Sequence, residues 1–198
     1  MQALVKFIAI ALLATFGLTG CSFHLFGPSK DTFYETVLDR FPDNRAALFG
    51  QGQVLLRNGQ YQEALPYLKR LTRLEPNNQQ VWLTLGRAYL EARDGLRAER
   101  AFRRAIGIRP TMDGELGLGN ALMLQGDLSA ARSVADRIAA SYGESAYLWR
   151  LRGDIAFMAD DPAQAAKAYN ESLALDPAQP SVQERLADLS ALVQVSQH

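Results

Sequence analysis

The stretch QQVWLTLGRAYLEARDGLRAERAFRRAIGIRPTM, residues 79 to 112, decides the fold of this 198-residue chain. Its small and apolar residues stand at fixed offsets, and a related pattern recurs 34 residues away, which indicates an internal repeat. The marker residues are Trp82, Leu85, Gly86, Tyr89, Ala98, Phe102, Ala105 and Pro110. A period of this length is typical of chains built from stacked supersecondary units.

Related units lie on both sides of this stretch. Residues 45 to 78 carry Leu48, Gly52, Leu55, Gly59, Tyr61, Ala64, Leu68 and Pro76. Residues 146 to 179 carry Trp149, Gly153, Ala156, Ala165, Tyr169 and Pro177. Residues 112 to 145 form a degenerate unit that is one residue out of frame and has Gly143 in place of the closing Pro. The sequence therefore predicts about four repeats.

These units resemble the tetratricopeptide repeat (TPR) family, whose 34-residue unit is a pair of antiparallel helices. The resemblance implies an all-α solenoid, because neither helix of a unit can bury its apolar stripe alone. Gly86 and Ala98 are expected where the two helices of a unit approach closely, with Trp82 and Phe102 filling the space around them. Pro110 is expected to end the second helix, because proline lacks the backbone N–H and clashes with the preceding turn.

The two ends of the repeat region fit the same plan. Residues 31 to 41, followed by Pro42, resemble the second helix of an N-terminal half-repeat. Residues 181 to 194 place Val182, Leu186, Leu189 and Val193 on one face, as expected of a C-terminal capping helix that shields the last apolar surface. The predicted TPR domain covers residues 31 to 198.

The first 20 residues have the layout of an export signal. Lys6 precedes an apolar run over residues 7 to 18, which is shorter than the roughly 20 residues needed to cross a bilayer. Leu18-Thr19-Gly20-Cys21 resembles the bacterial lipobox, which implies cleavage of residues 1 to 20, lipidation (palmitate) of Cys21 and a lipidated tether over residues 21 to 30. Ser22, in place of the Asp that retains such lipoproteins in the inner membrane, favours the outer membrane, with the protein facing the periplasm.

Composition argues against several classes of function. Lys and Arg total 21, as do Asp and Glu, and loss of Lys6 with the signal leaves a net charge of −1. A near-neutral chain gives no electrostatic reason to expect nucleic-acid binding. The two histidines, His24 and His198, lie in the tether and at the last position. We therefore expect no metal site, no cofactor, no small-molecule substrate and no enzymatic activity.

A protein-binding surface is the remaining prediction. In TPR proteins the first helix of each unit lines a concave groove at unit positions 2, 5, 9 and 12. Carried onto this sequence, the resemblance implies groove residues Phe49, Gln53, Leu56, Leu83, Arg87, Leu90, Leu116, Asn120, Met123, Tyr147, Arg150, Asp154 and Phe157. This mixture suits an amphipathic helix or an extended peptide. Leu56 and Leu90 fit equally well as packing contacts to a neighbouring helix, and binding on the convex face is the alternative to binding in the groove.

The resemblance extends to small lipoproteins of pilus and secretion systems. These include the pilotin type, which brings a secretin to the outer membrane, and the TadD-like component of tight-adherence (Flp) pili. It implies an outer-membrane scaffold for a secretin, pilus or secretion component. Because repeat motifs serve many functions, four alternatives stay open: a BamD-like role in outer-membrane protein assembly, a polysaccharide-export accessory, an enzyme accessory subunit and a structural spacer.

Overall fold

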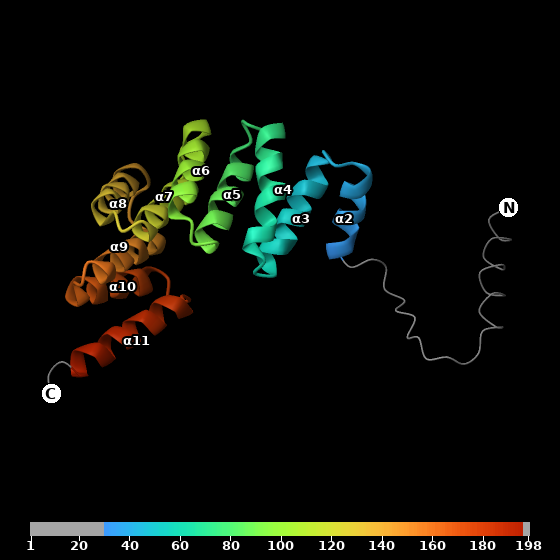
Figure 1. Cartoon of the computed structure of the whole chain (residues 1–198). Coiled ribbons are helices and arrows are strands. Elements are labelled where there is room, and N and C mark those ends of the chain that lie inside the picture. The colour runs from blue at the N-terminus through green and yellow to red at the C-terminus, as the bar shows by residue number, and fades with distance from the viewer. Residues whose placement is uncertain (1–29, 196–198) are drawn as a thin grey trace, which may run out of the picture.

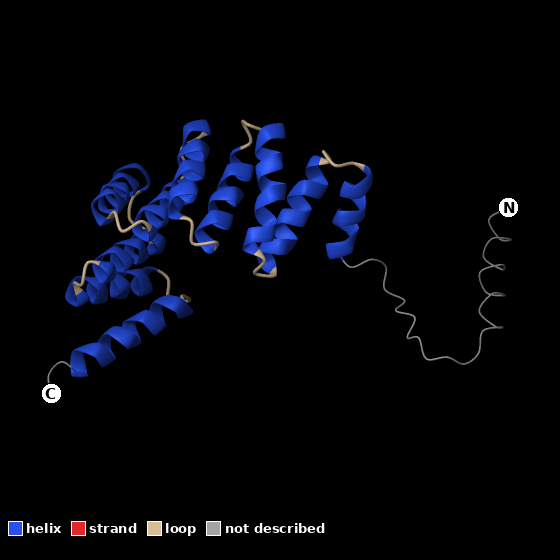
Figure 2. Ribbon diagram, viewed as in Figure 1, coloured by secondary structure: helices blue, strands red, loops and turns tan. Residues whose placement is uncertain are grey.

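The computed structural model describes residues 30 to 195, and side chains over residues 32 to 189. Over this range the chain forms ten helices and no strand (Figure 2). They are α2 (Lys30–Arg40), α3 (Arg45–Arg57), α4 (Tyr61–Leu74), α5 (Gln79–Glu91), α6 (Gly95–Ile108), α7 (Met112–Leu124), α8 (Leu128–Tyr142), α9 (Ala146–Met158), α10 (Pro162–Leu175) and α11 (Pro180–Val195). The all-α prediction is confirmed. The predicted signal peptide, Cys21 and the rest of the tether up to residue 29 lie outside the described residues.

The helices follow one another along a curved row that starts with α2 and ends with α11 (Figure 1). Four helical hairpins make up its body: α3 with α4, α5 with α6, α7 with α8, and α9 with α10. The first helices α5, α7 and α9 also contact one another from hairpin to hairpin. Helix α2 packs on α3 as a half-repeat, and α11 packs on α10 at the opposite end.

The turn inside each hairpin uses one backbone conformation. Its residues are Gly59, Arg93, Gly126 and Asp160, with φ of 76°, 60°, 79° and 57°. Glycine adopts this left-handed region without strain, whereas a side chain disfavours it. In the last three hairpins an aspartate then caps the second helix, because its carboxylate accepts a backbone N–H of the first turn. The repeat therefore exists as a recurring local geometry as well as a sequence pattern.

Close packing inside a hairpin depends on a glycine of its first helix. A β-carbon added to Gly86 would lie 2.8 Å from the Phe102 ring, and one added to Gly153 would lie 2.4 Å from the Tyr169 ring. Gly52 has the same relationship to Leu68, at 2.8 Å. The large residue stands 16 positions after the glycine each time. This agrees with the close approach predicted at Gly86.

In the third hairpin, a side chain from the following hairpin packs against the glycine of the first helix. Gly119 is its glycine, but Ala135 occupies the position 16 residues later, where the other hairpins have a larger side chain. Leu151 of the following hairpin lies there instead: a β-carbon added to Gly119 would be 2.9 Å from Leu151 Cδ2. The degenerate third unit is therefore completed by its neighbour.

One main core runs through the stack from α3 to α9. A smaller cluster of Ala165, Tyr169, Val182 and Leu189 joins α10 to α11, so that α11 covers the apolar side of the last hairpin. Within the described part of the chain, none of the helices combines the length and the apolar character that a membrane span requires.

Candidate functional site

Three hollows line the side of the stack that is formed by the first helices. The proximal hollow, of about 390 Å³, is lined by Gln53, Leu56, Arg57, Tyr61, Thr84, Arg87 and Glu91. The central hollow, of about 410 Å³, is lined by Arg87, Leu90, Phe102, Met112, Asp113, Leu116, Gly117, Asn120, Tyr147 and Arg150. The distal hollow, of about 670 Å³, is lined by Leu90, Glu91, Arg93, Asn120, Met123, Leu124, Arg150, Asp154, Phe157, Met158, Ser181, Arg185 and Asp188.

The three hollows are parts of one surface, because they share lining residues. Arg87 belongs to the proximal and the central hollow. Leu90, Asn120 and Arg150 belong to the central and the distal hollow. Glu91 lines both the proximal and the distal hollow. We call the combined surface the groove; it runs from α3 to α11 across α5, α7 and α9.

Most of the predicted groove residues lie on this surface. They are Gln53, Leu56, Arg87, Leu90, Leu116, Asn120, Met123, Tyr147, Arg150, Asp154 and Phe157. Phe49 and Leu83 line none of the three hollows. Leu83 is only 6% exposed within the main core, and Phe49 packs against the core from its edge. Because Leu83 is buried, we withdraw it as a candidate partner contact, whereas the half-buried Phe49 stays a prediction.

Helix α9 presents the most accessible apolar side chains of the groove. Tyr147 and Phe157 are 50% and 48% exposed, and Met158, which the position rule did not identify, is 50% exposed. The Arg150 guanidinium lies over the Tyr147 ring, 5.7 Å from its centroid. Leu56 and Leu90 are half-buried against the core while they also line hollows, so they combine the two roles left open by the sequence.

Helix α11 contributes a wall of the groove that the sequence analysis missed. Ser181, Arg185 and Asp188 line the distal hollow. The prediction stopped at the fourth unit because residues 181 to 194 were interpreted only as a cap. Counting α11 from Pro180, however, places Ser181 at position 2 and Asp188 at position 9, so the same rule could have found these two but not Arg185, which is at position 6.

Asp154, which lines the distal hollow as predicted, also forms contacts between helices. Its carboxylate accepts a hydrogen bond of 2.8 Å from the Tyr169 hydroxyl and forms an ion pair with Arg185. Burial, followed by the charge of Asp154, raises the pKa of Tyr169 to about 12. These contacts join α9, α10 and α11, so Asp154 positions the distal wall of the groove and its charge is already neutralised.

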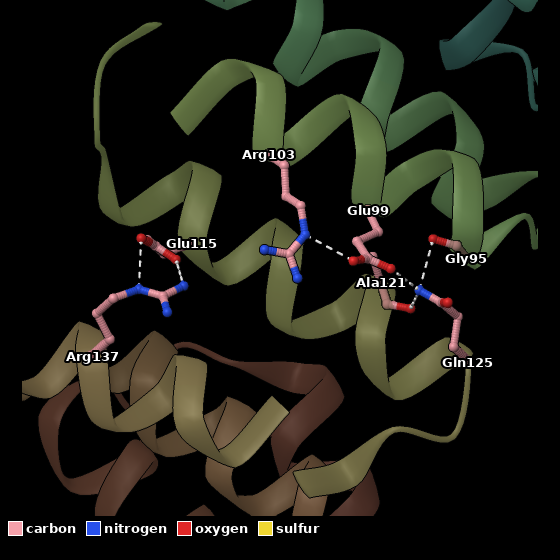
Figure 3. Close-up of polar contacts among 7 residues, drawn as sticks. All are labelled: Gly95, Glu99, Arg103, Glu115, Ala121, Gln125 and Arg137. Atoms are coloured by element: carbon pink, nitrogen blue, oxygen red, sulfur yellow. Dashed lines mark hydrogen bonds and ion pairs between the residues drawn. The ribbon is translucent and has the colours of Figure 1, made fainter. Parts of the chain in front are cut away.

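Polar contacts hold α7, the central helix of the groove, to its neighbours (Figure 3). Gln125 Nε2 donates to the Gly95 carbonyl at 3.2 Å and to Glu99 Oε2 at 2.8 Å, while Arg103 Nε donates to Glu99 Oε1 at 2.8 Å. These hydrogen bonds, that from Gln125 first, lower the pKa of the Glu99 carboxyl. The end of α7 is thereby tied to the beginning of α6.

A second contact in Figure 3 joins α7 to α8. The buried Glu115 carboxylate accepts two hydrogen bonds from Arg137, one from Nε at 3.0 Å and one from Nη2 at 2.5 Å. The two residues therefore form a bidentate ion pair. Glu115 is the fourth residue of α7, where α5 has Trp82 and α9 has Trp149. In the third repeat, therefore, an ion pair stands at the position that tryptophan holds in its neighbours.

A separate hollow of about 600 Å³ lies on the side of the second helices, between α8, α9 and α10. Its lining includes Trp149 and Arg152, whose guanidinium lies 4.7 Å from the Trp149 ring centroid and forms an ion pair with Glu144. None of the large exposed apolar side chains in the described residues belongs to it. Neither hollow surface holds a metal-binding cluster: no group of three His, Cys, Asp or Glu side chains in the described residues is arranged for a metal ion.

Comparison with known proteins identifies the family to which the repeats belong. The family model described as Tetratricopeptide repeat matches residues 32–78, 51–113 and 116–180. A curated relative, the CTR9 homolog of Arabidopsis thaliana, is 32% identical over 72 residues; the match covers 36% of this chain and 6% of that much longer protein.

Solved structures resemble most of the chain. A thermophilic TPR protein of Thermus thermophilus superposes with a TM-score of 0.67 at 18% identity, covering 81% of this chain and 88% of that chain. The pilF protein of Pseudomonas aeruginosa superposes with a TM-score of 0.58 at 23% identity, covering 80% and 72% of the two chains. At these identities the likeness is one of fold. Together with the family match over most of the described residues, it shows that this chain belongs to the tetratricopeptide repeat family.

Proposed function

We propose that this chain is an outer-membrane-anchored TPR scaffold that holds a protein partner in its groove during assembly of a pilus or secretion system, with the tight-adherence (Flp) type favoured. The observation that carries the binding part is the gathering of Tyr147, Phe157 and Met158, all about half exposed, on one helix of a continuous groove. Tyr147 lines the central hollow, and Phe157 and Met158 line the distal one. Apolar side chains exposed singly are ordinary, whereas several of them along one continuous groove are typical of a partner site.

The groove is favoured over the convex face for a physical reason. A protein partner gains most of its binding free energy by burying apolar and aromatic side chains in a pocket. The groove offers such side chains, and the hollow on the opposite side offers none that is both large and exposed. Stacked-repeat proteins generally bind their partners on the extended concave surface, which supports the same choice.

The envelope setting is supported by the sequence alone. Cys21 in its lipobox-like context is expected to carry acyl chains, and each buried methylene contributes about 0.8 kcal/mol to membrane binding. The likeness to pilF of P. aeruginosa concerns the fold and assigns no partner. BamD-like and polysaccharide-export lipoproteins share this architecture, so the identity of the captured protein distinguishes these roles.

Groove substitutions test the binding proposal. We expect Tyr147→Ser combined with Phe157→Ser to abolish capture of the native partner by the affinity-purified protein, with little change in thermal unfolding because both side chains are about half exposed. The matched control combines Leu96→Ser with Leu175→Ser, which are 52% and 56% exposed and line none of the hollows. Capture that survives the groove variant, or is lost equally in the control, would contradict the proposal.

Substitution of Cys21 tests the anchoring proposal separately. The Cys21→Ala protein is expected to leave the outer-membrane fraction, and intact mass spectrometry of the wild-type mature chain is expected to show residue 21 at its beginning with acyl chains attached. An unmodified Cys21 thiol on a chain that remains in the outer membrane would rule out lipid anchoring.

A further inference from the structure

The central hollow contains two arginines that form no ion pair with any acidic side chain in the described part of the chain. Arg87 extends from α5 and Arg150 from α9, and both line this hollow. Ion pairs among the described residues involve seven other arginines: Arg45, Arg70, Arg97, Arg103, Arg137, Arg152 and Arg185. Within the described residues, the Arg150 guanidinium lies over the aromatic ring of Tyr147 and makes no ion pair. The middle of the groove therefore presents positive charge that the described part of the fold does not neutralise.

The acidic groups of the groove do not balance these arginines. Among the described residues, Asp113 is the one carboxylate that lines the central hollow, and it forms no ion pair with either guanidinium group. In the distal hollow Asp154 is already paired with Arg185. The unpaired charges of the groove are then four arginines (Arg57, Arg87, Arg93 and Arg150) against three acids (Glu91, Asp113 and Asp188).

Apolar side chains surround the two unpaired arginines. Leu90 of α5, Leu116 of α7 and Tyr147 of α9 line the central hollow beside Arg87 and Arg150, and Asn120 adds an amide. A guanidinium group binds a carboxylate through two parallel hydrogen bonds, and such a bond is strengthened where apolar neighbours exclude water. The hollow thus offers carboxylate recognition within an apolar surface.

We infer that the occupant of the groove is a segment of a partner protein in which Asp or Glu side chains alternate with apolar ones. Its carboxylates meet Arg87 and Arg150, and its apolar side chains cover Leu90, Leu116 and Tyr147. This inference rests on the proposed function, since it names the chemistry of the partner for the same groove. The charges select the partner and its orientation, while the apolar contacts supply most of the affinity.

Selection from a random peptide library displayed on phage tests this inference. The bait is the protein purified in detergent from cells that express the full chain. The test variant combines Arg87→Gln with Arg150→Gln. The control combines Arg73→Gln with Arg100→Gln, because both of these arginines are exposed, lie outside the groove and take part in no ion pair among the described residues.

The wild-type and control proteins are expected to enrich peptides in which Asp or Glu is flanked by Leu, Phe or other apolar residues. The double variant is expected to recover these phage about thirtyfold less well, because two charge pairs of about 1 kcal/mol each are lost and each 1.4 kcal/mol is a factor of ten in affinity. Selected peptides without an excess of acidic residues, or equal recovery by the double variant, would overturn the inference.

Two further comparisons separate this inference from the function on which it rests. If the Tyr147→Ser, Phe157→Ser variant loses the native partner but the arginine variant retains it, the groove is the binding site, and the inference that the bound segment is acidic is wrong. If both variants retain it, the groove itself is wrong. A sedimentation-velocity dimer that dissociates on Arg87→Gln with Arg150→Gln would show that a second copy occupies the groove, which also overturns the inference.

Discussion

The ring of Phe102 on α6 lies against Gly117 on α7, so close that a β-carbon added to Gly117 would be 2.3 Å from the ring's Cε1. The same ring faces Gly86 on α5, at 2.8 Å from a β-carbon added there. One aromatic side chain therefore holds together the two helices of its own repeat and the first helix of the next. Tyr34 and Gly50 have the equivalent relationship between α2 and α3, at 2.4 Å.

This contact predicts opposite effects for two glycine-to-alanine substitutions. Alanine is favoured over glycine inside a helix by about 0.5–1 kcal/mol. At Gly117 the added methyl overlaps the buried Phe102 ring, so Gly117→Ala should lower the free energy of unfolding by about 1–3 kcal/mol. At Gly107, where an added β-carbon meets nothing within 4 Å, the substitution should be stabilising. Urea unfolding of both variants checks the prediction, and destabilisation of equal size at the two sites would contradict it.

The contact between Gly119 and Leu151 predicts a coupled pair. Leu151→Ala should cost about 2–5 kcal/mol, because a buried leucine is removed from the junction of the third and fourth repeats. In the wild type Gly119→Ala should be destabilising, whereas in the Leu151→Ala background the added methyl has room and becomes neutral or stabilising. A double-mutant cycle measures the coupling, expected to be about 1 kcal/mol. Strict additivity would show that Leu151 does not fill the space beside Gly119.

The Glu115–Arg137 ion pair predicts that replacing Arg137 alone lowers stability and that replacing Glu115 as well restores part of it. Arg137→Met should lower the free energy of unfolding by about 1–3 kcal/mol, because the buried Glu115 carboxylate loses both of its hydrogen bonds. Glu115→Met combined with Arg137→Met should be more stable than Arg137→Met alone, since no charge is then left buried without a partner. Chemical unfolding of the single and double variants measures this. A double variant that is less stable than the single one would contradict the explanation.

The raised pKa of Tyr169 predicts that the folded chain loses stability at alkaline pH. Burial, followed by the charge of Asp154, raises its pKa from 10.0 to about 12 in the folded chain. The unfolded chain therefore releases this proton first, and the stability associated with Tyr169 is present below pH 10 and is lost as the pH rises toward 12. Tyr169→Phe should flatten the decline in unfolding free energy over this window. An equally steep decline in the Tyr169→Phe protein would contradict this assignment.

The sequence predicted the helical stack because its signals are local. Glycines, prolines and large apolar residues recur at offsets set by two helices of fixed length, and a 34-residue period carries that pattern along the chain. Even the third unit, with Ala135 and Glu115 at two marker positions, kept enough of the pattern to be recognised. Its compensations could not be predicted, because Leu151 and Arg137 reach their partners through the packing of separate helices.

The groove was predictable in outline and not in detail for the same reason. Position counting identified Tyr147, Arg150 and Phe157, since side-chain direction along a helix follows from the sequence register. It assigned Leu83 to the surface, although neighbouring helices bury it, and it could not foresee that Arg185 neutralises Asp154. Burial and charge pairing depend on which helix lies next to which, and that information is tertiary.

Site-specific photo-crosslinking in cells tests the central claim most directly, which is that a protein partner lies in the groove. A photoreactive residue is placed either at Asn120, which lines both the central and the distal hollow, or at Asn170, which is exposed on the second helix α10 and lines none of the hollows. We predict a discrete adduct with one envelope protein from position 120 and none from position 170. The same adduct from position 170, with none from position 120, would contradict the account.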